Sequence, residues 1–384
     1  MQSTENTTPV ENPSSTTESM RAARMHQVGM PLTIDRVRRP GVGPRDVLVE
    51  VKACGVVPNL VNVLSRLQER SPYLALPELP AIFGLDAAGV VVEKGPQCHG
   101  VVLGQRVYVN PARYCGNCRS CRMGDTTSCD YFTFGGYFGF SPKSQTMFRD
   151  YPYGGLAEYM TAPADSLVNL PDCVSFETAA RWGYLGTGYG ALRRAGASAS
   201  TTLLINGVTG TLGVGVALLA LAMGVRRIFG TGRKKHLLER VRNLNPERIA
   251  VHSLDDQPLD EWVRSVNDGD GVDIVVDATA HGAPHSIMQQ GVEALRRGGR
   301  LVNISGMKGG VPFEVHKMMA RNQAIIGSLW FTTAHGQEMA DLAEAGLLDL
   351  NVLQHNVFPL EDVNTALSSL EARDGGFENF VVKP

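Results

Sequence analysis

The sequence lacks the features that mark several whole classes of protein. Its 36 lysine and arginine residues are balanced by 38 acidic residues, so there is no basic surplus for nucleic acid and no excess charge for an anionic membrane. The uncharged stretch 203–225 contains five glycines. Its apolar run over 214–225 is shorter than the roughly 20 residues that cross a bilayer. We therefore expect no nucleic-acid partner and no membrane partner.

A secretory leader is also missing. Residues 1–19 are rich in Ser, Thr, Asn and Glu and have neither a basic start nor an apolar core. Their composition predicts a disordered tail. Without a leader we expect a cytoplasmic protein whose seven cysteines stay reduced.

The rest of the chain has the composition of a folded protein, with 43% hydrophobic residues and a length of 384 residues that predicts two domains. Residues 20–175 alternate apolar and polar side chains between Gly/Pro turns, which predicts a β-rich domain. From 176 to 334, apolar strand patterns alternate with helical ones, which predicts a parallel sheet covered on both faces. The final segment, 335–384, is predicted to return to the first domain.

Four cysteines fall within one short loop that is otherwise poor in signals of regular structure. They are Cys115, Cys118, Cys121 and Cys129. Four thiolates at this spacing form a closed tetrahedral set for zinc, with no position left for a substrate. One structural zinc per chain is therefore predicted, with four free thiols or an iron–sulfur cluster as the alternatives.

A glycine-rich turn lies between a strand pattern and a helix pattern. The sequence Asn206-Gly-Val-Thr-Gly-Thr-Leu-Gly213 follows an apolar strand and opens an apolar helix. Glycines let the backbone approach a pyrophosphate, and the helix N-terminus supplies free N–H groups. The context predicts a dinucleotide site, and the alternative is a tight packing turn.

The end of the second strand of this unit predicts which dinucleotide binds. An NAD site places a carboxylate there for the ribose hydroxyls, but this chain has Gly232 followed by Arg233, Lys234 and Lys235. Arginine pairs with a 2′-phosphate in a bidentate way, so NADPH is predicted. The alternative is a solvated helix start.

These features together resemble the medium-chain dehydrogenase/reductase superfamily, in its zinc alcohol dehydrogenase group. The resemblance extends from Met20 to Pro384 and includes the motifs at 43–55, 104–107, 155–159 and 179–189. It implies an α/β fold, with a GroES-like catalytic domain (20–175 plus 335–384) and a Rossmann domain (176–334). It also implies a small-molecule substrate and a homodimer or homotetramer joined near 325–329.

The resemblance assigns cofactor contacts by position. They are Thr187, Gly210, Thr211, Leu212, Gly232, Arg233, Lys234, Ala278, Thr279, Ile304, Ser305 and Ile326. The resemblance places Thr187 against the nicotinamide.

The chain departs from this group at the catalytic zinc. The positions of the three zinc ligands are taken by Val57, Leu85 and Gly183, none of which offers a lone pair to the metal. Asp86 remains nearby, but one carboxylate does not make a zinc site. We therefore expect no catalytic zinc.

Without a Lewis acid, negative charge that develops on the substrate must be met by hydrogen-bond donors. Reduction of a polarised C=C bond by NADPH suits that limitation, and a zinc-independent alcohol dehydrogenase or ketoreductase is the alternative. The resemblance places Asn59, Asn62 and Tyr184 in the cleft. Tyr184 is the first choice for the proton donor, or else a wall of the pocket, and the two asparagines orient substrate or cap a turn. The aromatic run 131–140 is expected to lie in the core or an interface, or alternatively to form a lid.

Overall fold

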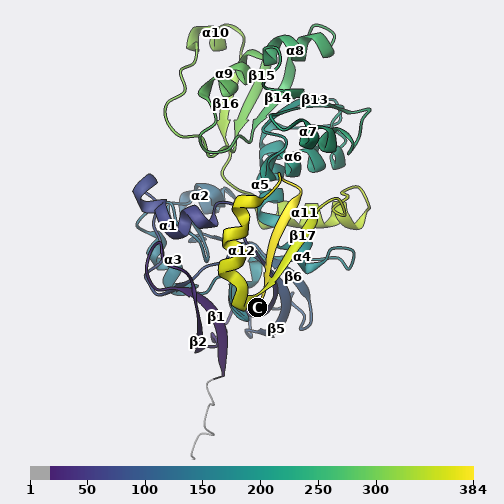
Figure 1. Ribbon diagram of the computed structural model, residues 1–384. Coiled ribbons are helices and arrows are strands. Elements are labelled where there is room, and N and C mark those ends of the chain that lie inside the picture. Colours follow the sequence, from purple (N-terminus) through teal and green to yellow (C-terminus); the bar gives the residue numbers. More distant parts are fainter. Residues whose placement is uncertain (1–17) are drawn as a thin grey trace, which may run out of the picture.

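A computed structural model describes residues 18–384 as two lobes with the C-terminal segment lying along the lower one (Figure 1). The tail predicted for residues 1–19 therefore lies almost wholly outside the described residues. Only its end is described, and strand β1 already begins at Ser19.

The lower lobe is built on antiparallel strands. A seven-stranded sheet has the order β10-β6-β5-β3-β18-β17, with β9 also paired to β3, and a smaller sheet has the order β2-β1-β4. A third pair, β7 with β8, flanks the cysteine loop. The strands are β1 (Ser19–Met25), β2 (Thr33–Arg38), β3 (Asp46–Gly55), β4 (Ala81–Ile82), β5 (Asp86–Lys94), β6 (Arg106–Val109), β7 (Ala112–Arg113), β8 (Thr133–Phe134), β9 (Tyr159–Pro163), β10 (Leu167–Asn169), β17 (Gln354–Pro359) and β18 (Glu378–Lys383).

The upper lobe holds one six-stranded parallel sheet with the order β13-β12-β11-β14-β15-β16. Strand order reverses between β11 and β14, the position at which doubly wound sheets bind their ligands. The strands are β11 (Thr202–Asn206), β12 (Arg227–Gly232), β13 (Ile249–Ser253), β14 (Val272–Asp277), β15 (Leu295–Asn303) and β16 (Ala324–Gly327). This arrangement confirms the predicted α/β fold class, with a GroES-like unit and a Rossmann-type sheet.

Some helices cover the two faces of the parallel sheet, and others pack in the lower lobe. They are α1 (Leu60–Arg70), α2 (Arg119–Arg122), α3 (Ser144–Asp150), α4 (Phe176–Ala179), α5 (Trp182–Ala195), α6 (Thr211–Ala222), α7 (Lys235–Arg242), α8 (Leu259–Val266), α9 (His285–Glu293), α10 (Val315–Ala320), α11 (Thr333–Glu344) and α12 (Val363–Ser369). One apolar core runs from the lower sheet through α5 and α6 to one face of the parallel sheet, and a second core lies on the other face.

The apolar runs of the upper lobe predict strands at 202–206, 227–231, 273–277, 300–304 and 325–329, and all five are present, four of them with shifted ends. The strand predicted at 300–304 is longer and begins at Leu295, and the strand predicted at 325–329 ends at Gly327. Strand β13 in the upper sheet and strand β17 beside the final strand were not predicted. Strand β18 pairs with β3, so the C-terminal segment does return to the lower sheet. Among the described helices, none is long and apolar enough to span a membrane.

Candidate active site and metal centre

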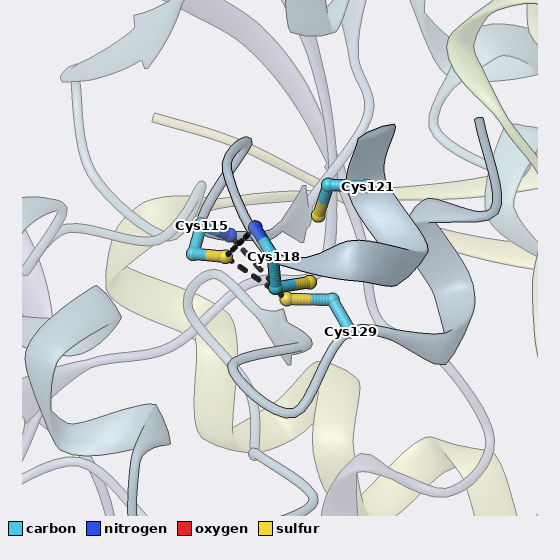
Figure 2. Close-up of side chains that lie close together, drawn as sticks. All are labelled: Cys115, Cys118, Cys121 and Cys129. Carbon is cyan, nitrogen blue, oxygen red and sulfur yellow. Dashed lines mark hydrogen bonds between the residues drawn. The ribbon is translucent and has the colours of Figure 1, made fainter. Parts of the chain in front are cut away.

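The four loop cysteines converge on one point (Figure 2). Their sulfur atoms all lie within 4.8 Å of one another, and the Sγ atoms of Cys115 and Cys129 are 3.6 Å apart. A tetrahedral zinc with Zn–S bonds of ~2.3 Å places its sulfurs roughly 3.8 Å apart. Within residues 18–384, these cysteines form the only group of three or more side chains placed to hold a metal.

Backbone groups of the loop also suit thiolate ligands. The N–H of Cys118 donates to Cys115 Sγ at 3.4 Å, and the N–H of Tyr131 donates to Cys129 Sγ at 3.4 Å. Hydrogen bonds of this kind stabilise the negative charge on sulfur. The donor set and its spacing therefore fit a structural zinc, whose ligands would be these four sulfurs.

The glycine turn lies at the carboxyl edge of the parallel sheet, between β11 and α6. Gly207 has φ of +76°, and a Cβ on Gly213 would stand 2.2 Å from the Gly207 carbonyl oxygen. Only glycine fits such a close approach of strand and helix. Helix α6 begins at Thr211 without a side-chain cap, so its first N–H groups are available to an anion.

Two arginines that the sequence analysis did not single out lie at this turn. Arg373 donates to Thr211 Oγ1 at 2.5 Å. Arg181 is buried and donates to the carbonyl oxygens of Thr211 and Gly376, and burial lowers its pKa to about 9. Arg181 follows two alanines and precedes a tryptophan, and a charge in such an apolar stretch is the signal that could have identified it.

The end of β12 presents the basic residues expected there. Gly232 ends the strand, and Arg233 and Lys234 are exposed. Asp374, from the segment that precedes β18, pairs with Lys234 Nζ at 2.8 Å and with His236 Nε2 at 2.9 Å. A carboxylate therefore does approach this point, but it comes from a distant part of the sequence.

The other expected cofactor residues are distributed around the same edge of the sheet. Gly210, Thr211 and Leu212 lie where α6 begins, Ala278 and Thr279 follow β14, Ile304 and Ser305 follow β15, Ile326 lies within β16, and Thr187 lies in α5. The Thr187 hydroxyl donates to the Gly183 carbonyl at 2.8 Å. Their contacts with a dinucleotide remain predictions.

In the zinc alcohol dehydrogenase group three positions carry the catalytic zinc ligands. In this chain each of these positions is closely packed and has no ligand atom. Val57 and Leu85 are buried apolar side chains. At Gly183 an added Cβ would stand 2.2 Å from Asp86 Oδ1 and 2.7 Å from the Trp330 ring. No side chain, and so no ligand atom, fits at Gly183 unless its surroundings move.

Asp86 is fully buried beneath this position. Its Oδ1 accepts hydrogen bonds from Tyr108 Oη at 2.8 Å and from the Gly183 N–H at 3.1 Å. Its Oδ2 has no hydrogen-bond partner among residues 18–384. Burial raises the pKa of Asp86 to about 7, although Tyr108, Gly183 and Arg181 each act to lower it.

The amide of Asn59 has a defined orientation. Arg70 can only donate, and its Nη1 lies 2.9 Å from Asn62 Oδ1, which turns the Asn62 amide nitrogen toward Asn59. Asn62 Nδ2 then donates to Asn59 Oδ1 at 3.2 Å. The Asn59 N–H₂ group is thereby left free to donate elsewhere. Asn59 stands at the N-cap of α1 without capping it, so the turn-capping interpretation is wrong for Asn59.

Two tyrosine hydroxyls share this corner of the cleft. Burial and the nearby Asp86 together raise the pKa of Tyr184 to about 12, and the Asn59 backbone N–H opposes the rise. Burial also holds the pKa of Tyr137 well above its usual range, and the Asn59 side chain opposes that rise. Both hydroxyls are therefore neutral donors at pH 7. The Tyr137 hydroxyl is buried without a hydrogen-bond partner in the described part of the chain.

Tyr137 comes from the aromatic run, whose side chains pack inward. Phe134 lies against Trp330, with ring centroids 4.5 Å apart, and Phe132 is almost fully buried. This packing fits the expected core role of the run. Tyr137 was missed as a site residue because a tyrosine in an aromatic cluster has the same sequence pattern whether or not its hydroxyl faces the cleft.

Comparison with known proteins agrees with this architecture. Residues 43–172 match the model of the alcohol dehydrogenase GroES-like domain, and residues 211–345 match that of the zinc-binding dehydrogenases. An alcohol dehydrogenase of Geobacillus stearothermophilus is 30% identical over 349 residues, which are 90% of this chain and 94% of the relative. The chain belongs to the zinc-type alcohol dehydrogenase-like group of the medium-chain dehydrogenase/reductase superfamily.

Further relatives of this alcohol dehydrogenase-like oxidoreductase cover nearly its whole length. An NAD-dependent alcohol dehydrogenase of Sulfolobus acidocaldarius is 28% identical, covering 92% of this chain and 96% of its own. The crystal structure of AibC has a TM-score of 0.80 at 25% identity, and it covers 99% of each chain.

Proposed function

We propose that this oxidoreductase reduces a polarised C=C bond, of an enone, an enal or a conjugated imine, with NADPH and without a catalytic zinc. The proposal rests on Gly183, where a Cβ would stand 2.2 Å from Asp86 Oδ1, together with the apolar side chains at Val57 and Leu85. The cleft has hydrogen-bond donors in place of metal ligands.

A reduced nicotinamide dinucleotide, when bound, would supply the hydride that conjugate reduction adds to the β-carbon of the substrate. The negative charge that develops on the enolate oxygen is met by donors, and the oriented N–H₂ group of Asn59 is one. Tyr184, a neutral hydroxyl beside Asn59, delivers a proton to the α-carbon. Asn62 acts by orienting the Asn59 amide.

The choice of NADPH is supported by Gly232 at the end of β12 and by the exposed Arg233 that follows it. A 2′-phosphate gains a charge-assisted hydrogen bond from Arg233, whereas a side chain at position 232 would crowd Thr209. Against this, three curated relatives are named NAD-dependent alcohol dehydrogenases, so NADH is the cofactor alternative. Arg373 and the N-terminus of α6 would hold the pyrophosphate of either dinucleotide.

The cysteine lobe completes the proposed enzyme. Cys115, Cys118, Cys121 and Cys129 would hold one structural zinc per chain, and reduced thiols fit a cytoplasmic location. Strand β16 ends one edge of the parallel sheet, with a partly exposed Ile325 and Ile326. That edge could pair with a second copy in the proposed homodimer or homotetramer.

A zinc-independent alcohol dehydrogenase or ketoreductase is the second candidate. The names of the Geobacillus and Sulfolobus relatives favour it. The same donors would then stabilise and protonate an alkoxide oxygen in place of a carbon.

A single assay separates the two candidates. The purified protein is incubated with NADPH and either an enone or the corresponding saturated ketone, and loss of the reduced cofactor is followed. We expect turnover of the enone. Turnover of the ketone alone would support the second candidate and overturn the first. Zinc is counted in the same preparation, with one ion per chain expected; a second tightly bound ion whose removal abolishes turnover would overturn the zinc-free mechanism.

The cofactor assignment has a matched pair of variants. Arg233→Ala is expected to raise the KM for NADPH about 10- to 100-fold and to leave the KM for NADH unchanged, since it removes one charge-assisted contact with a phosphate. Lys235→Ala, an exposed neighbour in α7, is the control. Equal losses for the two dinucleotides in Arg233→Ala would reject the assignment.

A further inference from the structure

The cleft contains a buried carboxylate that the proposed mechanism has not used. Asp86 is fully buried, and its Oδ1 is occupied by Tyr108 and by the Gly183 N–H. Its Oδ2 has no hydrogen-bond partner among residues 18–384. An ionised oxygen in that state loses its solvation without compensation, whereas a protonated oxygen can donate.

The carboxylate borders a small cavity between the two lobes, which both polar and apolar side chains line. The volume of the cavity is about 10 Å³, and a water molecule needs roughly 10–15 Å³. Asp86, Arg181, Tyr184, Thr211 and Arg373 all line it. Tyr184, the proposed proton donor, and Asp86 therefore border the same space, whose volume is about that of one water molecule.

We propose that Asp86 stores the proton that the reaction consumes and passes it to Tyr184 across this cavity. Asp86 does not touch the substrate, so it is a positioning and proton-holding residue that acts through Tyr184. The inference rests on the proposed reductase function, and it holds for both C=C and C=O reduction because each consumes one proton per hydride.

The proton steps balance. The Tyr184 O–H bond breaks as a C–H bond forms at the α-carbon, whose electron pair comes from the enolate. The tyrosinate then takes a proton from the cavity water, and the water takes one from the Asp86 carboxyl. Asp86 is left as a carboxylate, which regains its proton from solvent between turnovers. The hydride is the only reductant, and the bound dinucleotide supplies it.

The surroundings of Asp86 bring its pKa into the range where the carboxyl can both give and regain a proton near neutral pH. Burial raises its pKa to about 7. The titratable and charged groups that face it or the cavity are Tyr108 from β6, Cys54 from β3, Arg181 from the residue before α5, Tyr184 from α5, Tyr137 from the aromatic run, Arg373, and Glu378 from β18. Tyr108 and Arg181 favour the ionised form and offset part of the burial.

The first test measures the proton directly. Infrared difference spectra of the full-length, zinc-loaded protein are recorded from pH 5 to pH 9, with and without the oxidised dinucleotide. We expect a protonated-carboxyl band that disappears with a midpoint near the pKa of about 7 and is absent from Asp86→Asn. Asparagine keeps the shape and the Oδ1 acceptor but cannot titrate. A spectrum without a titrating carboxyl in this range would overturn the proposal.

The second test uses the pH profile of kcat with whichever of the enone or ketone the wild type reduces. A donor must be protonated, so kcat should fall as the pH rises through the pKa of Asp86. Tyr108→Phe removes a hydrogen bond that lowers this pKa, so the falling limb should move up by about one unit. Tyr189→Phe, whose hydroxyl faces Glu338, is the control and should not move it.

Asp86→Asn should lower kcat about 100-fold with little change in KM and should remove the falling limb. Turnover by Asp86→Asn with an unchanged limb, or no shift in Tyr108→Phe, would overturn the role of Asp86 alone. Absence of turnover by the wild type with both substrates would overturn the proposed reductase function, and with it this role. Should Asp86→Asn fail to fold, Tyr108→Phe and the wild-type spectra decide the matter.

Discussion

The cysteine lobe and the nicotinamide cleft belong to the same polypeptide, but only the lobe has ligand atoms at the positions where this family binds metal. In the lobe, four sulfurs lie within 4.8 Å of one another, and backbone N–H groups point at two of them. In the cleft, the corresponding positions hold two buried apolar side chains and a glycine with no room for a Cβ. The lobe needs a ligand atom to organise a loop with little apolar burial. The cleft is already closed by packing, with a carboxylate in the space that a ligand would take.

The largest expected effect comes from breaking the lobe. Cys115→Ser should reduce the zinc content from one ion per chain to near zero and lower the melting temperature by more than about 10 °C, because metal-binding energy is folding energy in such a loop. Elemental analysis and calorimetry measure the two effects. Cys173→Ser, an exposed cysteine outside the cluster, should change neither. A Cys115→Ser protein that lacks zinc but is as stable as the wild type would contradict a structural role for the zinc.

The next effect concerns Asp86, the buried carboxylate that accepts a hydrogen bond from the Gly183 N–H. The raised pKa of Asp86 means that the native state binds a proton between pH 4 and pH 7 that the unfolded state does not, so the wild type loses stability as the pH rises across this window. Asp86→Asn has no such loss. The free energy of unfolding of Asp86→Asn relative to the wild type should therefore rise by up to about 4 kcal/mol from pH 4 to pH 8.

Urea unfolding at each pH measures this difference. A difference that stays constant with pH would mean that Asp86 has an ordinary pKa in the folded protein.

A third variant tests whether the cleft can be turned back into a ligand site. Gly183→Cys should destabilise the fold by about 1–3 kcal/mol, since its Cβ would meet Asp86 Oδ1 and the Trp330 ring. Gly41→Ala, where an added Cβ meets nothing within 4 Å, is the control and should be nearly neutral. Thermal unfolding measures both. If the Gly183→Cys protein is as stable as the wild type and binds a second zinc, the cleft and the lobe do not differ in their capacity to hold a metal.

The smallest effect concerns the orientation of Asn59. Arg70→Ala removes the donor that turns the Asn62 amide and should lower kcat/KM about 3- to 10-fold, the equivalent of one hydrogen bond of about 1 kcal/mol. Steady-state kinetics measure it. Arg66→Ala, on an exposed position of the same helix, should have no effect. Equal activity of both variants would show that the orientation of the Asn59 amide does not limit the reaction.

Local patterns predicted much of the fold. The strand at Thr202–Asn206 and the strand at Arg106–Val109 have the bounds expected from their apolar runs. Strand β13 was missed because His252 and Ser253 interrupt its short apolar pattern, although both side chains are buried. Strand β17 was missed because most of its side chains are exposed or only partly buried, which leaves no apolar pattern to detect. Pairing with β18 holds it in the sheet.

The candidate site was predicted less completely. Spacing alone identified the cysteine lobe and the glycine turn. The four cysteines lie within one short segment, and so do the glycines that allow the close approach of strand and helix. Arg373 lies 162 positions from Thr211, to which it donates, and no local pattern connects the two. The approach of Asp374 to Lys234, and of Tyr137 to Asn59, is likewise a product of chain folding.

By itself the sequence determined the superfamily, the order of the two structural units, the cluster of four thiols and the absence of ligand atoms at Val57, Leu85 and Gly183. Each of these depends on the identity of a residue or on a short spacing, which folding does not alter. Only the tertiary structure decided the environment of Asp86. One oxygen is held by Tyr108 and the Gly183 N–H, the other has no hydrogen-bond partner among the described residues, and the residue lines a cavity shared with Tyr184. The proton affinity of a carboxyl depends on its solvation and neighbours, and both are set by segments that meet only in the folded chain.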